Sequence, residues 1–137
     1  MLGITVTMRT RTVLGLLLTL VVLLAPATAA GQKPASEEPD TATITPAMVD
    51  AGRALFHARG TCFACHGMKL EGTQIAPTLI KKEWKDAKGG ELKNIYYVVT
   101  HGVSGTLMVP YPGAISKREA ANAASYIWSV NHRGAKP

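Results

Sequence analysis

The stretch Cys62-Phe63-Ala64-Cys65-His66 decides how this chain folds. Two cysteines three positions apart, followed at once by a histidine, form the C-x-x-C-H pattern of covalent haem attachment. Each thiol can add across one vinyl group at the porphyrin edge, and a single turn of chain keeps both sulfurs on one side of the macrocycle. His66 then supplies the proximal iron ligand. The sequence therefore predicts one haem c, bound covalently through Cys62 and Cys65.

A structural zinc site and a redox dithiol are the alternative uses of such a cysteine pair. Zinc usually takes four Cys or His ligands from two clusters, and the chain has no cysteine besides Cys62 and Cys65. A thioredoxin-like dithiol is expected beside a βαβ pattern, which the sequence lacks. Haem attachment therefore explains the pair better than either alternative.

The chain from Thr45 to Val130 resembles a class I cytochrome c, a small helical monohaem electron carrier. The resemblance rests on the C-x-x-C-H motif together with Pro77 and Met108. Three further positions support it: Gly52, Phe56 and Tyr126. It implies an all-α fold in which three main helices surround one haem, and a role in electron transport rather than in enzymatic catalysis.

The resemblance identifies Met108 as the second axial iron ligand, beside His66. Met108 lies on a loop rich in Gly and Pro, where the family places its axial methionine. Val109 separates it from Pro110, whereas the family commonly has proline directly after the methionine. A thioether ligand stabilises ferrous iron and raises the reduction potential. His101 is the competing ligand, and a His/His pair gives a lower potential.

Pro77 and Trp84 are the other candidates near the haem. In the family, a proline carbonyl on the loop after the haem motif accepts a hydrogen bond from the ligating histidine, and Pro77 stands at this place. Such an outer acceptor fixes the ring and tunes the metal. Trp84 is a candidate donor to a haem propionate, and core packing explains it equally well.

Residues 1–30 are interpreted as a secretory signal peptide. Arg9 and Arg11 precede an apolar run at 13–25, and small residues follow at 27–30, which is the order of such a peptide. The run is shorter than the ~20 residues that span a bilayer as a helix. We therefore expect that the peptide is cleaved and that the protein is periplasmic, with an uncleaved membrane anchor as the alternative. Translation starts at either Met1 or Met8.

The remaining chain divides into a polar leader at 31–44 and a cytochrome c domain at 45–137. The leader has only small apolar residues apart from Ile44, so we expect it to be flexible. Because a domain of this size has a small hydrophobic core, we expect that covalently bound haem is needed to stabilise its fold.

Three helices are predicted in the domain. The first begins at Thr45, an N-cap followed by Pro46, and ends near Gly60. The second covers Glu91 to Thr100, although Tyr96 to Thr100 has the composition of a strand. The last begins with Ser116-Lys117-Arg118-Glu119, a capping box. The resemblance implies that the first and last helices cross, and Gly52 is expected at their contact. A short helical turn is expected near Lys81 to Lys85.

The positive charge of the chain bears on its partners. The formal net charge is +6, and six lysines cluster between the haem motif and the middle helix: Lys69, Lys81, Lys82, Lys85, Lys88 and Lys93. This cluster is either a solvated face or a patch that steers the protein to an acidic redox partner. Nucleic acid is excluded for an exported haem protein.

The sequence leaves more than one function open. A free electron carrier is favoured, and a haem subunit of a periplasmic dehydrogenase or oxidase complex is the first alternative. A haem enzyme or gas-binding protein would need an open sixth position with acid–base groups nearby. Around Met108 the chain offers Tyr111 and apolar or small residues instead.

Overall fold

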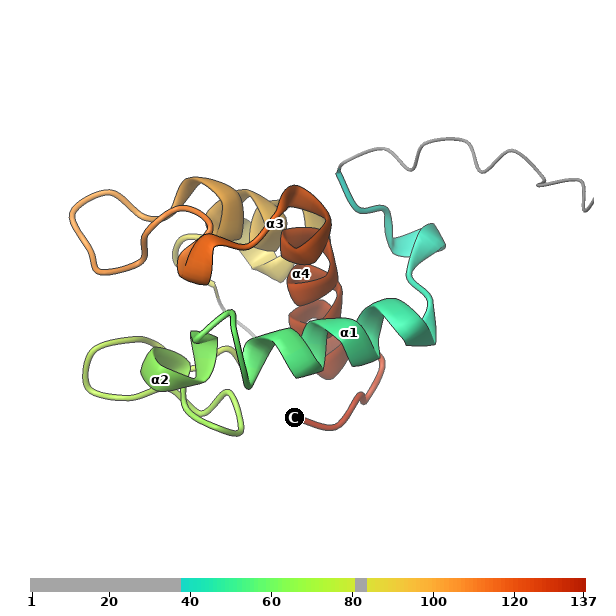
Figure 1. Cartoon of the computed structure of the whole chain (residues 1–137), viewed down its shortest axis with the longest axis horizontal. Coiled ribbons are helices and arrows are strands. Elements are labelled where there is room, and N and C mark those ends of the chain that lie inside the picture. The colour runs from blue at the N-terminus through green and yellow to red at the C-terminus, as the bar shows by residue number, and fades with distance from the viewer. Residues whose placement is uncertain (1–37, 81–83) are drawn as a thin grey trace, which may run out of the picture. The chain divides into compact units, whose positions relative to one another are not determined.

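The computed structural model describes residues 38–80 and 84–137, and these residues form helices and no strand (Figure 1). Their α-helices are α1 (Pro46–Phe56), α2 (Cys62–His66), α3 (Leu92–His101) and α4 (Lys117–His132). Short 3-10 helices occur as η1 (Thr41–Thr43), η2 (Lys88–Gly90) and η3 (Pro112–Ala114). The predicted all-α fold with three main helices is confirmed, and the haem motif itself adds the single turn α2.

Helix α1 begins as the sequence predicts and ends earlier. The Thr45 hydroxyl accepts a hydrogen bond from the Met48 amide at 3.3 Å, and Pro46 occupies the first helical position. The expected end near Gly60 is wrong, because the helix stops at Phe56. The Gly60 amide instead donates to the Leu55 carbonyl at 3.0 Å, which turns the chain toward the haem motif.

The crossing of α1 with α4 is confirmed at Gly52. A Cβ atom on Gly52 would lie 2.6 Å from the carbonyl carbon of Asn122 and 2.8 Å from the Cβ of Tyr126. Beside this contact, Phe56 and Tyr126 are fully buried and meet edge to face, with ring centroids 5.7 Å apart. Such an aromatic pair adds about 0.5–1.5 kcal/mol beyond the area that it buries. Figure 1 shows α1 passing across α4.

Helix α4 packs against both α1 and α3. Its N-terminus carries the predicted capping box, with Ser116 and Glu119 bonded to each other's backbone amides. Its buried face consists largely of small side chains: Ala120, Ala121, Ala123, Ala124 and Ser125. These side chains let two helices approach α4 closely.

Helix α3 confirms the predicted middle helix to within one residue at each end. Leu92, Ile95 and Val99 are buried on one face against α4, and Gly102, with φ of 69°, ends the helix. The strand-like residues 96–100 are helical because the helical spacing of the buried residues outweighs their composition.

The expectation of a flexible leader at 31–44 needs correction at its C-terminal end. Ile44 is only 9% exposed and belongs to the hydrophobic core. The Arg133 guanidinium of the α4 C-cap donates to the Thr41 carbonyl at 2.9 Å and holds η1 in place. The packed domain therefore begins before Thr45, because one apolar side chain and one hydrogen bond fix this short segment.

Some predictions concern residues outside the described part of the chain. The expected signal peptide at 1–30 lies there, as do residues 81–83 of the expected turn. In the described residues, no helix is both long enough and apolar enough to cross a membrane. Trp84 is half-buried against the core, and Gly90 leaves room for its indole ring.

Candidate haem site

The two cysteines and His66 occupy one helical turn. Cys62 is the first residue of α2 and His66 is the last, so this short helix carries the whole motif. Cys62 and Cys65 are both half-buried, and Cys62 packs against the core. Burial, together with the neighbouring Cys65, raises the pKa of the Cys62 thiol to about 11. Before haem is attached, the Cys62 side chain therefore keeps its S–H proton at neutral pH.

His66 is held by the carbonyl group of Pro77. Its Nδ1 atom lies 2.9 Å from the Pro77 oxygen. A ring that donates a proton from Nδ1 carries its lone pair on Nε2, which is the form that binds a metal. The structure therefore contains the contact on which the predicted role of Pro77 depends.

The segment 67–79, called the haem loop below, is braced against α2. The Gly72 amide donates to the His66 carbonyl at 2.8 Å, and the Thr73 hydroxyl donates to the Cys65 carbonyl at 2.7 Å. Within the loop, the Leu79 amide donates to the Leu70 carbonyl at 2.8 Å. These bonds join both halves of the loop and keep Pro77 next to α2.

Met108 lies on the loop between α3 and η3 and is half-buried. Its side chain packs against a second core cluster that includes Leu55, Val99 and Ile115. The Val103 amide donates to the Met108 carbonyl at 2.9 Å, which closes the loop on itself. In Figure 1 this loop and α2 lie toward the same side of the domain.

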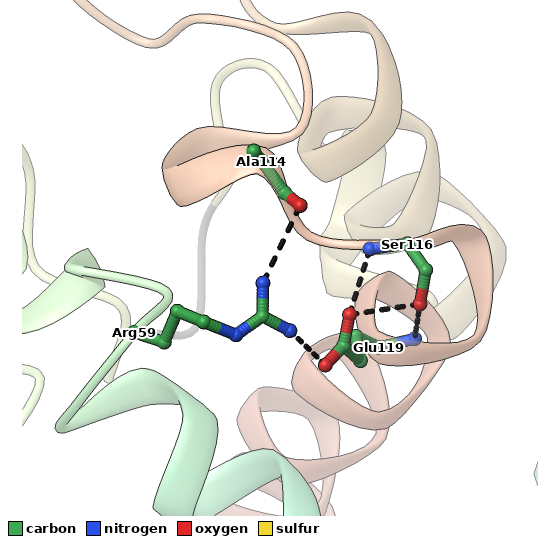
Figure 2. A network of polar contacts seen from close by, with 4 residues as sticks. All are labelled: Arg59, Ala114, Ser116 and Glu119. Atoms are coloured by element: carbon green, nitrogen blue, oxygen red, sulfur yellow. Dashed lines mark hydrogen bonds and ion pairs between the residues drawn. The ribbon is translucent and has the colours of Figure 1, made fainter.

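Arg59, in the chain that precedes Cys62, contacts η3 and α4, the two elements that follow the Met108 loop (Figure 2). Its guanidinium donates to the Ala114 carbonyl at 3.4 Å and forms an ion pair with Glu119 of α4. A Cβ atom on Gly113 would lie 3.2 Å from the Gly60 Cα, so the two backbones touch here. Sequence reasoning missed Arg59, because no motif marks a basic residue at this position.

Two residues at the start and the end of η3 have an unfavourable backbone conformation. Tyr111 has φ of 46° and Ala114 has φ of 55°, values that residues other than glycine rarely adopt. Such strain persists only where the surroundings fix the backbone, and it concentrates at functional sites. The strain lies three and six residues after Met108, in the segment that Arg59 holds.

The Arg59–Glu119 contact predicts a dependence of stability on pH. Arg59, with help from the Ser116 amide and hydroxyl, lowers the pKa of Glu119 to about 2 from an ordinary value of 4.5. A lowered pKa stabilises the fold above pH 4.5, and this stabilisation disappears as the pH falls toward 2. We expect Glu119→Gln to melt below the wild type at pH 7, and we expect this difference in Tm to disappear as the pH falls from 4.5 to about 2.

Thermal unfolding across this pH range checks the prediction. Glu91→Gln is the control, because the Glu91–Lys93 pair is exposed on both sides and should contribute little. A gap between Glu119→Gln and wild type that stayed constant down to pH 2 would contradict the assignment.

The residues present fit a flat, apolar, iron-containing group. Two thiols, an imidazole oriented by a carbonyl and a thioether are a donor set for haem iron and its covalent attachment. The two loops also carry large apolar side chains that are exposed: Ile75 at 61%, Leu107 at 72% and Val109 at 55%. A large apolar surface of this kind commonly marks a binding site.

The remaining histidines differ in their surroundings. His101 and His132 are exposed, and each stacks on an aromatic ring of its own helix, Tyr97 and Trp128 respectively. His57 differs from them, because it is half-buried and its Nε2 lies 2.8 Å from the Met68 carbonyl oxygen.

Four of the six clustered lysines are described, and all four are exposed: Lys69, Lys85, Lys88 and Lys93. The other two, Lys81 and Lys82, lie outside the described residues. The structure thus leaves the described part of the cluster accessible to a partner.

Comparison with solved structures finds small cytochromes. Cytochrome cL of the marine methylotroph Methylophaga aminisulfidivorans MPT is 25% identical over 62% of this chain, with a TM-score of 0.55. The match covers 56% of that cytochrome, so this chain corresponds to about half of its length. Cytochrome c6 of the diatom Phaeodactylum tricornutum is 31% identical over 64% of this chain and 98% of its own, with a TM-score of 0.52.

A more distant likeness concerns the fold alone. The reducing HAO-like protein complex Kustc0457/Kustc0458 of Kuenenia stuttgartiensis is 20% identical over 63% of this chain and 44% of that chain, with a TM-score of 0.54. Comparison with curated protein sequences finds no match.

The family model for subunit III of cbb3-type cytochrome c oxidase matches residues 47–127, which is more than half of the chain. The matched region includes the C-x-x-C-H motif, Pro77 and Met108. The chain therefore belongs to this family of c-type cytochromes, and it is a class I cytochrome c of the electron-carrier type with haem c as its cofactor.

Proposed function

We propose that this protein carries single electrons between redox proteins of the periplasm, with His66 and Met108 as the axial ligands of its haem. The observation that carries the proposal is the construction of the Met108 loop. Met108 is half-buried on a loop that leads into η3, which has an unfavourable backbone at both ends and is contacted by Arg59 from the segment before Cys62. A ligand held in this way stays in place in both oxidation states, which electron transfer requires.

Each site residue has a defined part in this proposal. Haem c supplies the one-electron Fe(III)/Fe(II) couple. Cys62 and Cys65 would attach the group to α2, and His66, with its ring oriented by the Pro77 carbonyl, would bind the iron. Met108 supplies the soft, neutral second ligand, which stabilises ferrous iron and raises the reduction potential.

The haem subunit of a larger periplasmic oxidase or dehydrogenase complex is the second candidate. The matching family model, which is named for an oxidase subunit, favours it. Both candidates use the same haem site and differ only in whether the partner stays bound. An enzymatic role has less support, because the guanidinium of Arg59 is engaged by Glu119 and Ala114 and the His101 ring is exposed and stacked on Tyr97.

Export and docking belong to the same proposal. Residues 1–30 have the order of a signal peptide, and c-type haem attachment takes place outside the bacterial inner membrane. If the segment stays attached, it anchors the domain to the membrane. The exposed lysines around 69–93 are proposed as a docking patch for an acidic partner.

The purified holoprotein tests the proposal. We expect the reduced protein not to bind carbon monoxide at neutral pH, because Met108 occupies the sixth position. We also expect its electron exchange with an acidic redox protein to slow as ionic strength rises. Ready carbon monoxide binding by the wild type would refute the His66/Met108 pair, and rates that ignore salt would refute the docking patch.

A further inference from the structure

The haem loop at 67–79 is held from outside by two side chains. His57, the C-cap of α1, places its Nε2 atom 2.8 Å from the Met68 carbonyl oxygen. Asn131, near the end of α4, donates its side-chain amide to the Leu79 carbonyl at 2.8 Å. The two contacts therefore reach opposite ends of the loop from two different helices.

We propose that His57 and Asn131 are positioning residues that hold the Pro77 carbonyl against His66 and thereby tune the reduction potential of the haem. This inference rests on the proposed function, because it concerns the electron-carrying iron that His66 binds. It goes beyond the His66–Pro77 contact, since it assigns the residues that fix the distance between its two partners.

The His57 ring is fixed in direction as well as in place. Its ring meets Phe56 edge-on with centroids 5.1 Å apart, and its Nδ1 atom lies 2.9 Å from the Arg53 carbonyl oxygen. A neutral imidazole has one N–H group, so the bridge to the Met68 carbonyl requires the tautomer that carries its proton on Nε2. The Tyr126 ring lies 6.2 Å away on α4. Because the ring is packed on these sides, the contact to Met68 cannot be lost by simple rotation of the side chain.

The other described histidines outside the motif show that this bridge is specific to His57. His132 also bonds the carbonyl four residues earlier through Nδ1, at 2.9 Å, and stacks on Trp128. His101 does the same with Tyr97, at 3.0 Å. Neither ring reaches a carbonyl outside its own helix in the described structure, so they are natural controls for His57.

Asn131 is fixed in a comparable way. The Nδ2 group donates to the Ile127 carbonyl of its own helix and to the Leu79 carbonyl, both at 2.8 Å. An amide group has two N–H donors, and these two contacts use both of them. The side chain therefore has a single direction that serves the haem loop.

The two contacts lie close to the bond that they are proposed to control. Met68 follows His66 by two residues, and Leu79 follows Pro77 by two residues. A shift at either end of the loop therefore changes the distance between His66 Nδ1 and the Pro77 oxygen. A strong hydrogen bond at Nδ1 makes the imidazole a more basic ligand, which favours ferric iron and lowers the potential. Weakening it should raise the potential.

His57→Phe and Asn131→Leu in the holoprotein test the proposal. Phe keeps the ring packing and Leu keeps the volume, while both remove the donor. We expect each variant to shift the ferric-to-ferrous equilibrium about threefold toward ferrous iron, which is about 28 mV for one electron. We also expect the His66 Nδ1–H proton to exchange with solvent about tenfold faster by NMR.

Two matched controls accompany these variants. His132→Phe removes a ring with the same helix contact and no bridge, and Asn94→Leu removes an amide that donates to the Lys88 carbonyl at 2.9 Å. Both controls should keep the potential and the exchange rate of the wild type. If His57→Phe and Asn131→Leu behave like the controls, the proposal is wrong.

A second pair of variants keeps the test valid if His57→Phe folds poorly. Gln at position 57 can place a donor where Nε2 lies, and Asn can place one where Nδ1 lies. We expect His57→Gln to restore the wild-type potential and exchange rate, and His57→Asn to behave like His57→Phe. The opposite order would overturn the role of the Met68 contact.

Failure of this inference can be told apart from failure of the proposed function. Carbon monoxide binding by the wild type concerns Met108 and would refute the proposed ligand pair. Exchange of the His66 Nδ1–H proton concerns His66 and Pro77 alone. An exchange rate unchanged in both anchor variants would therefore refute the positioning role even where the ligand pair is correct.

Discussion

The Met108→Ala variant is expected to lose its sixth iron ligand while keeping its covalently bound haem. The oxidised variant should lack the methionine-to-iron charge-transfer band, and the reduced variant should bind carbon monoxide at neutral pH. The reduction potential should fall on the order of 0.1 V, a fraction of the ~0.8 V that axial ligands span. The physical reason is that loss of the thioether removes the ligand that favours ferrous iron.

Two other substitutions are the controls for Met108→Ala. His101→Ala should have no effect on the band, because the His101 ring is exposed and stacked on Tyr97. Met68→Ala should be equally silent, because Met68 is 56% exposed and only two residues from His66. Absorption spectra of the three oxidised variants decide the matter. A wild type that lacks the band, together with carbon monoxide binding that appears in reduced His101→Ala and not in reduced Met108→Ala, would assign the ligand to His101.

The Gly52→Leu variant is expected to show the largest loss of stability. Even the first side-chain carbon would overlap the Asn122 carbonyl group, and backbone of a packed helix cannot rotate away. Overpacking of this kind costs about 1–3 kcal/mol or more, and the longer leucine side chain places the cost at about 3 kcal/mol or above. For a domain of this size that corresponds to a drop in Tm of about 12 °C or more.

Gly52→Ala separates the crossing from helix propensity. Alanine is about 1 kcal/mol better than glycine in a helix interior, so propensity alone predicts stabilisation. The overlap with Asn122 predicts the opposite sign. Ala54→Leu, at an exposed site on the same helix, should remain within ~0.5 kcal/mol of the wild type. A Gly52→Ala variant that melts above the wild type would remove the close crossing from the account.

Sequence patterns predicted the features that depend on nearby residues. The N-cap at Thr45 and the capping box at Ser116 each satisfy amides within three residues, so their signals are local. Gly52 was identifiable because a glycine inside an otherwise regular helix needs a reason. The residues 96–100 show the limit of composition, since burial against α4 decides their conformation.

Residues whose partners are distant backbone carbonyls escaped prediction. Arg59 bonds a carbonyl 55 residues away, His57 one that is 11 residues away, and Asn131 one that is 52 residues away. A carbonyl group is the same in every residue, so the sequence marks such a partner only where a family resemblance identifies it, as at Pro77. The burial of Ile44 in the core was also not predicted, because a single apolar residue among polar neighbours gives no periodic pattern.

The Arg133–Thr41 hydrogen bond brings the beginning and the end of the described domain together. Ile44 and Ala135 also line the same small hollow, which has a volume of about 210 Å³. A short linker would therefore suffice to join the two ends into a ring, and the entropy lost on closing such a ring grows only slowly with its length. The fold is thus suited to circular permutation and to fusion with another module. Either change would alter the chain only near Thr41 and Arg133 and would leave the Met108 loop unaltered.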